Sequence, residues 1–179
     1  QAMGGIMSIT GQPGGPPTRV GASIGDIAAG LFCALGITSA LHHRDRTGEA
    51  TLVDVAMLDC QVAILENAIA RLAASGEIPR PLGTRHPSIT PFEAYPTADG
   101  HLVVAAGNDA LFQRLVAALE LPSLGSDARF ASNEARCAHA DVLRELLSQR
   151  LRERPTAAWS ALLEAAGVPC GPIQNVAQV

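Results

Sequence analysis

The stretch that decides the fold runs from Gly25 to Arg44 and reads GDIAAGLFCALGITSALHHR. Its large apolar side chains recur at helical spacing, and no charged residue follows Asp26 until Arg44. The pattern predicts a long helix that ends near Gly48, since arginines followed by a glycine are typical of a helix C-terminus. Because small and polar residues interrupt the run, we expect a helix buried in protein and not a membrane span.

The segments that follow this helix predict alternating elements. Residues 50–55 are β-branched and alternate in polarity, which predicts a strand. Residues 56–75 carry apolar side chains at helical spacing, and Gly76 marks the end of the predicted helix. Residues 76–91 are rich in proline and glycine without periodicity, so we expect a linker or an active-site loop there.

Residues 92–179 predict a small α+β unit. Strands are expected at 92–96 and 101–106, joined by a turn at Ala98-Asp99-Gly100. Helices are expected at 109–119, at 132–151 and from Pro155 to Gly167. The fold class is therefore α/β, with residues 1–75 as part of a larger domain, 76–91 as the linker and 92–179 as the small domain.

Composition excludes several classes of protein. The chain has 179 residues, of which 47% are apolar and 17% charged, so a sizeable core is expected. All 13 basic residues are arginine, against 17 acidic residues, and no basic cluster stands out. A nucleic-acid partner is not expected without a basic face, and the absence of lysine excludes Schiff-base chemistry.

The four cysteines are widely spaced and form no C-x-x-C pair: Cys33, Cys60, Cys137 and Cys170. This arrangement predicts neither a metal site nor a disulfide framework, and it is typical of proteins in a reducing cytoplasm.

Asp26 is the carboxylate whose surroundings most invite a catalytic role. It opens an apolar helix, where backbone N–H groups hold anions and where a carboxylate stays ionised to act as a nucleophile on an acyl group. Asp is also a common helix N-cap, so spacing alone favours a capping role. Weaker candidates for substrate binding are Arg19, as a carboxylate clamp, and His86 with Ser88 in the predicted loop.

Several motifs together resemble one enzyme family. They are Gly4–Gly11 (GGIMSITG), the Gly25-Asp26 pair, Gly83–Ile89 (GTRHPSI), Asp127–Phe130 (DARF) and Gly167–Ile173 (GVPCGPI). From Gly4 to Val176 the chain resembles the family III CoA-transferases, a superfamily that includes formyl-CoA transferase, carnitine CoA-transferase and α-methylacyl-CoA racemase. It looks most similar to the group with succinate–hydroxymethylglutarate CoA-transferase, as an internal fragment of such a protein.

The resemblance implies an activity and a role for Asp26. Coenzyme A would pass from an acyl-CoA such as succinyl-CoA to a small carboxylic acid, through an aspartyl anhydride and an aspartyl-CoA thioester on Asp26. Coenzyme A enters as substrate, and no metal is implied. The CoA-binding residues are unknown, because in the family most of them lie in a segment that this sequence does not contain.

The resemblance also implies an assembly and leaves two alternatives open. A Rossmann-like large domain and a small domain would belong to an interlocked homodimer in the cytoplasm, with no nucleic-acid or membrane partner, and the isolated fragment would be inactive. One alternative is an α-methylacyl-CoA racemase that uses the same Asp for proton transfer with an upstream His. The other is a non-catalytic scaffold, since fold does not imply function.

Overall fold

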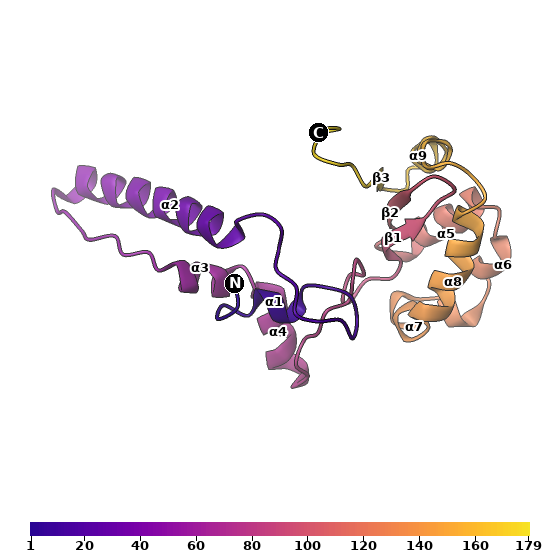
Figure 1. Cartoon of the computed structure of the whole chain (residues 1–179), viewed down its shortest axis with the longest axis horizontal. Helices are drawn as coiled ribbons and strands as arrows, with labels where there is room; N and C mark the ends of the chain where they lie inside the picture. Colours follow the sequence, from indigo (N-terminus) through magenta and orange to yellow (C-terminus); the bar gives the residue numbers. More distant parts are fainter. The chain divides into compact units, whose positions relative to one another are not determined.

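The computed structural model describes all residues 1–179 and divides the chain into two compact units (Figure 1). Unit 1 comprises Gln1–Gly83 and unit 2 comprises Thr84–Val179. The boundary lies within residues 76–91, where the sequence loses its periodicity.

Unit 1 is helical. Its elements are α1 (Ile6–Ile9), α2 (Ile24–Thr47), α3 (Met57–Ala63) and α4 (Glu66–Ser75). The predicted ends of α2 and α4 are confirmed: Gly48 and Gly76 follow them with φ of 77° and 72°. Glycine adopts this left-handed conformation without the steric penalty that a Cβ atom brings, so each glycine ends its helix.

The strand predicted at residues 50–55 is wrong. These residues form no ladder; they lie in an extended segment that runs back alongside α2 toward α3 (Figure 1). Val53 packs directly on α2 at Gly36. The contact is close, since a Cβ atom added to Gly36 would lie only 2.8 Å from Val53 Cγ1. The local sequence suits a strand, but a strand requires a second backbone to pair with, and no other segment of this chain provides one.

The helix predicted at residues 56–75 is interrupted. It consists of α3 and α4, because the backbone departs from α-helical geometry at Leu65, whose φ and ψ are −87° and 17°. The Leu65 amide donates to the Val62 carbonyl at 3.1 Å, three residues back and not four. The apolar periodicity continues across the break, which is why the sequence alone predicts one helix.

Helix α2 is largely exposed in this chain, so the prediction of a buried helix is wrong. Leu31 and Leu35 are 67% and 62% exposed, and only Gly25 and Ala28 of the helix are buried. By length and composition α2 is also apolar enough to cross a membrane, with 11% of its most apolar window buried. A helix that is apolar on all sides lacks a polar face to direct toward water.

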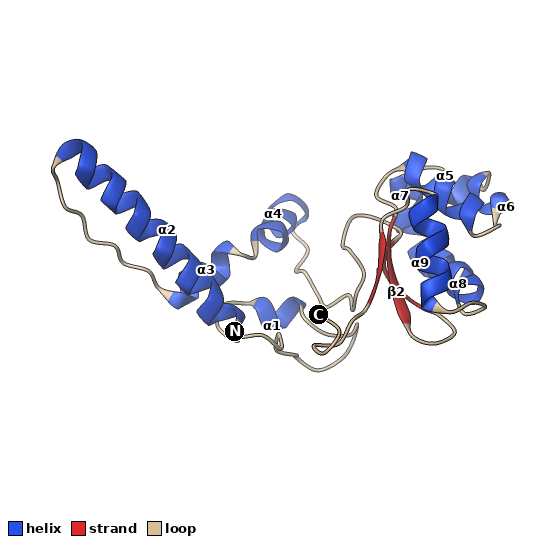
Figure 2. Ribbon diagram, turned by 90° about the horizontal axis from the view of Figure 1, so that it is seen from above, coloured by secondary structure: helices blue, strands red, loops and turns tan.

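Unit 2 contains an antiparallel sheet with the strand order β1-β2-β3, covered by helices on one face (Figure 2). Its strands are β1 (Phe92–Pro96), β2 (His101–Ala105) and β3 (Cys170–Pro172). The β1–β2 hairpin is confirmed, with Phe92 opposite Ala105 and Pro96 opposite His101.

The helices of unit 2 are α5 (Asp109–Ala118), α6 (Pro122–Gly125), η1 (Ala128–Phe130), α7 (Asn133–Ala138), α8 (Ala140–Leu151) and α9 (Thr156–Ala165). Side chains from the strands and helices form one fully buried core that includes Tyr95, Leu102, Phe112, Leu147 and Trp159. The helix predicted at residues 132–151 is divided into α7 and α8 at His139, whose φ and ψ of −116° and 26° are not helical.

Candidate functional site

Asp26 lies in the first turn of α2 and does not cap it. The N-cap is Ser23, which makes no side-chain capping bond, and Asp26 is the third residue of the helix. The prediction that Asp26 is the cap is therefore wrong by three positions. Its carboxylate is exposed and takes part in no hydrogen bond or ion pair. A carboxylate here is favoured by the positive end of the helix dipole, and both of its oxygens are free to contact a ligand.

The turn that carries Asp26 rests on the small buried part of unit 1. The buried residues of this unit are Gly4, Gly25, Ala28, Cys60 and Gln61. Gly25 and Ala28 belong to α2, and Cys60 and Gln61 belong to α3. Most of the packing that fixes α2 is therefore concentrated at the turn with the candidate nucleophile, while the rest of the helix extends away from it.

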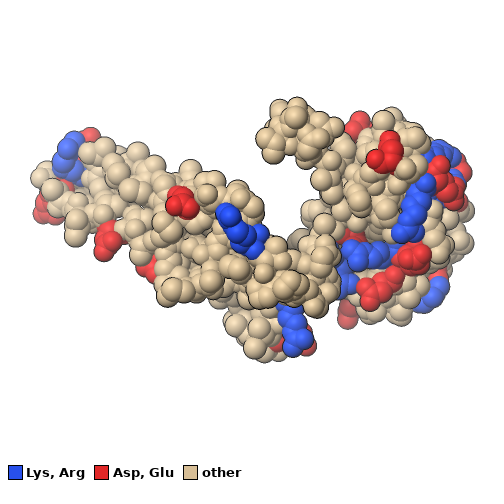
Figure 3. Space-filling model, in the orientation of Figure 1, with Lys and Arg blue, Asp and Glu red and all other residues tan.

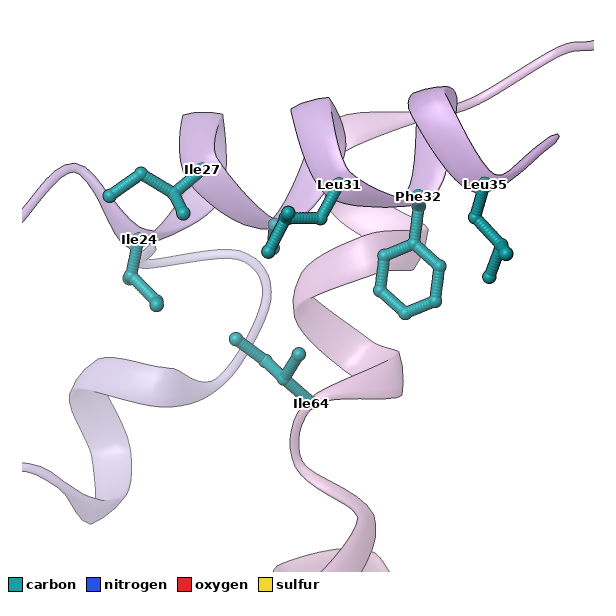
Figure 4. A pocket seen from close by; sticks show the side chains of 7 residues that line it. Ile24, Ile27, Leu31, Phe32, Leu35 and Ile64 are labelled. Carbon is teal, nitrogen blue, oxygen red and sulfur yellow. The ribbon is translucent and has the colours of Figure 1, made fainter. Parts of the chain in front are cut away.

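An apolar groove of about 310 Å³ lies along the first three turns of α2 (Figure 4). It is lined by Ile24, Ile27, Ala28, Leu31, Phe32, Leu35 and Ile64. Ile24 and Ile27 flank Asp26 in sequence, but Asp26 is not part of the lining. The groove offers no polar side chain to orient a ligand, whereas binding sites for small molecules combine apolar walls with a few polar groups. The groove is therefore suited to contact with another apolar surface.

Arg19 is exposed and makes no ion pair, so its guanidinium is free to bind an anion. The neighbouring Val20 is fixed by Gln1, whose Oε1 accepts from the Val20 amide at 2.9 Å and whose Nε2 donates to the Val20 carbonyl at 3.4 Å. Arg19 and Asp26 make no contact with one another by hydrogen bond or ion pair. The role of Arg19 in substrate binding stays a prediction.

The structure brings His86 and Ser88 together within unit 2. The imidazole of His86 stacks on Phe92 with 5.2 Å between ring centroids, and its Nδ1 accepts from the Ser88 backbone N–H at 3.2 Å. With Nδ1 as acceptor, the neutral ring carries its proton on Nε2. The Ser88 hydroxyl makes no hydrogen bond to the imidazole, so this arrangement is not a Ser–His nucleophilic pair.

Two polar residues of α7 anchor the loop that carries His86 and Ser88. Asn133 donates to the Ser88 carbonyl at 2.9 Å and accepts from the Thr90 amide at 3.1 Å. Arg136 is fully buried and donates from Nε to the Thr90 carbonyl at 2.7 Å. The loop is therefore held by side chains and not only by its own turns. The polar i, i+3 spacing of Asn133 and Arg136 is visible in the sequence, but nothing there shows that Arg136 is buried.

Charged side chains of both signs are interleaved over unit 2 on the face shown in Figure 3, and few lie over the α2 region. Unit 2 contains several surface ion pairs, such as Arg129–Asp127 at 2.7 Å and Arg85–Asp141 at 3.2 Å. The neighbouring arginine lowers the pKa of Asp127 through hydrogen bonding. No group of three or more His, Cys, Asp or Glu side chains is arranged to hold a metal ion.

The sequence model of CoA-transferase family III matches residues 1–179, the whole chain. The chain belongs to CoA-transferase family III. The resemblance seen in the sequence motifs is thereby confirmed, and the exposed Asp26 lies in the Gly-Asp pair that carried that resemblance.

Curated proteins named as CoA-transferases are similar to the chain over the same range. The chain is 42% identical over 179 residues to an acetyl-CoA:oxalate CoA-transferase of Acetobacter aceti, covering 99% of this chain and 46% of that protein. It is 39% identical over 179 residues to a succinate–glutarate CoA-transferase of Agrobacterium fabrum, covering 100% of this chain and 45% of that protein. The chain thus spans about half the length of the curated relatives it matches.

A solved structure of the family supports the fold. A CAIB/BAIF family protein from Brucella suis is 40% identical to the chain with a TM-score of 0.81, covering all of this chain and 47% of that one. A Mycobacterium tuberculosis protein is 28% identical with a TM-score of 0.86, covering 99% of this chain and 46% of that one. The predicted α/β fold class, as part of the family III fold, is confirmed.

Proposed function

We propose that this chain supplies the covalent nucleophile of a CoA-transferase that exchanges coenzyme A between an acyl-CoA and a small carboxylic acid. The observation that carries the proposal is the state of Asp26, an exposed carboxylate in the first turn of a long helix with no hydrogen-bond or ion-pair partner. A carboxylate in this state is free to attack an electrophile, whereas one committed to a structural ion pair is not.

In the proposed reaction, a carboxylate oxygen of Asp26 attacks the thioester carbonyl carbon of the donor acyl-CoA. The C–S bond breaks, leaving an aspartyl–acyl anhydride and the CoA thiolate. The thiolate then attacks the aspartyl carbonyl of the anhydride, which forms an aspartyl-CoA thioester and releases the donor acid. Both steps conserve the energy of the thioester bond, so the exchange needs no nucleotide and no redox partner.

The acceptor acid completes the cycle by the same steps in reverse. Its carboxylate attacks the aspartyl-CoA carbonyl and expels the CoA thiolate, leaving an aspartyl–acceptor anhydride. The thiolate attacks the acceptor carbonyl of that anhydride, which yields the new acyl-CoA and restores the Asp26 carboxylate. Stabilising the tetrahedral intermediates requires hydrogen-bond donors, and the free backbone N–H groups at the start of α2 are of this kind.

The proposed substrates are acyl-CoA and small carboxylates, with succinyl-CoA as donor. The support comes from the names of the relatives, which are transferases between acetyl-CoA and oxalate and between succinate and glutarate. Arg19, His86 and Ser88 are proposed to bind the carboxylate or acyl group, since a free guanidinium and an imidazole N–H are donors to such groups. The protein is further proposed to act as a homodimer in the cytoplasm.

The test uses the intact gene product, with CoA transfer from succinyl-CoA to oxalate or glutarate as the assay. Asp26→Asn keeps the shape of the side chain but cannot form the anhydride, so turnover is expected to fall on the order of a thousandfold or more. Glu66→Gln is the matched control, because Glu66 is an exposed carboxylate in the first turn of α4. The control is expected to keep full turnover. Transfer that survives Asp26→Asn would overturn the proposal.

A further inference from the structure

Gln61 of α3 lies directly behind the turn that carries Asp26. A Cβ atom on Gly25 would lie 3.0 Å from Gln61 Nε2 and 3.3 Å from its Cδ, so the amide group rests against the backbone of Gly25. On the other side, a Cβ atom on Gly4 would lie 2.8 Å from the Gln61 Cβ. The two glycines leave the space that the glutamine side chain occupies.

The amide of Gln61 is buried without complete hydrogen bonding. The residue is 4% exposed, and its Oε1 has no hydrogen-bond partner. A buried acceptor without a donor destabilises the folded state, and an apolar side chain of similar length, such as methionine, would fill the space without this penalty. Packing alone therefore does not explain why a polar amide group occupies this position.

We infer that Gln61 is a positioning residue for Asp26. This inference rests on the proposed function, in which Asp26 is the nucleophile. Gln61 acts through Gly25: its planar amide lies against the Gly25 backbone and fixes the first turn of α2, so the backbone of the next residue, Asp26, is held in one position. Small displacements of a reacting group lower the rate strongly, whereas binding of the substrate does not depend on them in the same way.

The first experiment compares Gln61→Met with wild type in the intact gene product. The thioether chain is of similar length but flexible, so kcat for CoA transfer is expected to fall about tenfold to a hundredfold while KM changes less than about twofold. Because the substitution removes an unpaired buried acceptor, the thermal midpoint is expected to stay equal or rise. Gln149→Met is the control, since Gln149 is exposed on α8 and bonds only Glu145.

A second variant separates positioning from packing. Gln61→Glu keeps the shape of the amide but places an ionisable group beside the turn of Asp26. When that carboxyl is ionised, its negative charge disfavours a second negative charge on the neighbouring turn, so the acid limb of the kcat/KM profile is expected to move to higher pH. Gln149→Glu, made on the surface, is expected to leave the profile unchanged.

A double-mutant cycle tests the contact with Gly25. Gly25→Ala directs a methyl group at the amide and is expected to lower kcat, whereas in Gln61→Ala the space is free. The double variant is therefore expected to have the kcat of Gln61→Ala within about twofold, because the two side chains interact. Losses that multiply independently, or a Gln61→Met enzyme with full kcat and an unchanged pH profile, would overturn the inference. If Asp26→Asn abolishes transfer in that case, the proposed function stands and only the role of Gln61 fails.

Discussion

Unit 2 and unit 1 differ in how much they bury. The largest fully buried side chains, among them Trp159, Arg136, Tyr95 and Phe112, all belong to unit 2. Unit 1 buries only small residues and Gln61, and its long helix α2 leaves leucines more than half exposed. Since burial of apolar surface is the main force that opposes conformational entropy, unit 2 contains most of the stability of this chain. The proposed nucleophile lies on the unit with the smaller core.

The largest expected effect of this difference is on the free energy of unfolding when a leucine is truncated to alanine. Leu147→Ala removes a fully buried side chain from the core of unit 2 and is expected to lower the free energy of unfolding by about 2–5 kcal/mol. Leu35→Ala changes a side chain of α2 that is 62% exposed, and about 0.5 kcal/mol or less is expected.

Each unit has its own readout for this comparison. Trp159 is the only tryptophan, so its fluorescence during urea denaturation reports unit 2, and amide hydrogen exchange reports the opening of α2. If the two truncations lowered the free energy of unfolding equally, the difference in burial between the units would not correspond to a difference in stability.

The buried arginine of unit 2 gives the next largest effect. Arg136 donates to the carbonyls of Thr90 and Phe130 and to Asp109, and it stacks over Phe112 at 4.6 Å. Arg136→Met leaves two carbonyls without a donor, so a loss of about 3 kcal/mol is expected in the same urea experiment.

The control for Arg136→Met is Arg129→Met. Arg129 is an exposed arginine that pairs with Asp127 at the surface, where ion pairs contribute little, so its substitution is expected to change the urea midpoint much less. An Arg136→Met midpoint equal to that of the control would contradict the anchoring role of Arg136.

The smallest effect concerns the pH dependence of unit 2. Asp99 accepts from the Thr156 amide at 2.7 Å and from its hydroxyl at 2.8 Å, and these bonds lower the pKa of Asp99 from its ordinary value. A carboxyl with a lowered pKa stabilises the fold above its unfolded pKa, and this contribution is lost as the pH falls through the folded pKa. The stability difference between wild type and Asp99→Asn is therefore expected to shrink from pH 5 toward about pH 2.

Thr156→Val sharpens that measurement, because it removes the hydroxyl donor and keeps the amide donor. The pH-dependent part of the stability is expected to be smaller in this variant than in wild type. A difference between wild type and Asp99→Asn that stays constant with pH would contradict the role of these hydrogen bonds.

The sequence predicts unit 2 better than unit 1, for a physical reason. In unit 2 the hairpin and the capping residues Asn108 and Ser132 act locally: each of these two side chains accepts a hydrogen bond from the backbone of its own helix. In unit 1 the segment 50–55 has the composition of a strand, but pairing depends on a partner that local sequence does not reveal. The exposure of α2 is likewise a property of what packs on it, which periodicity cannot show.

The candidate site shows the same limit. The Gly25-Asp26 pair is visible as a motif in the sequence. The spacing of apolar residues predicts Asp26 as the N-cap, because it does not show that the helix begins two residues earlier, at Ile24. No pattern in the sequence points to Gln61, because its role depends on contacts with Gly4 and Gly25, which are distant from it in the chain. The contact between His86 and the Ser88 backbone depends on a loop conformation held by Asn133, which no local pattern predicts.

The measurement that tests the central claim most directly is mass spectrometry of the intact gene product after brief incubation with succinyl-CoA and trapping with hydroxylamine. Hydroxylamine attacks the activated aspartyl carbonyl and converts that residue to a stable hydroxamate. This mass change is expected on the peptide that contains Asp26, and no change is expected on that peptide in the Asp26→Asn variant. Rapid CoA transfer by a protein whose Asp26 peptide stays unmodified would contradict it.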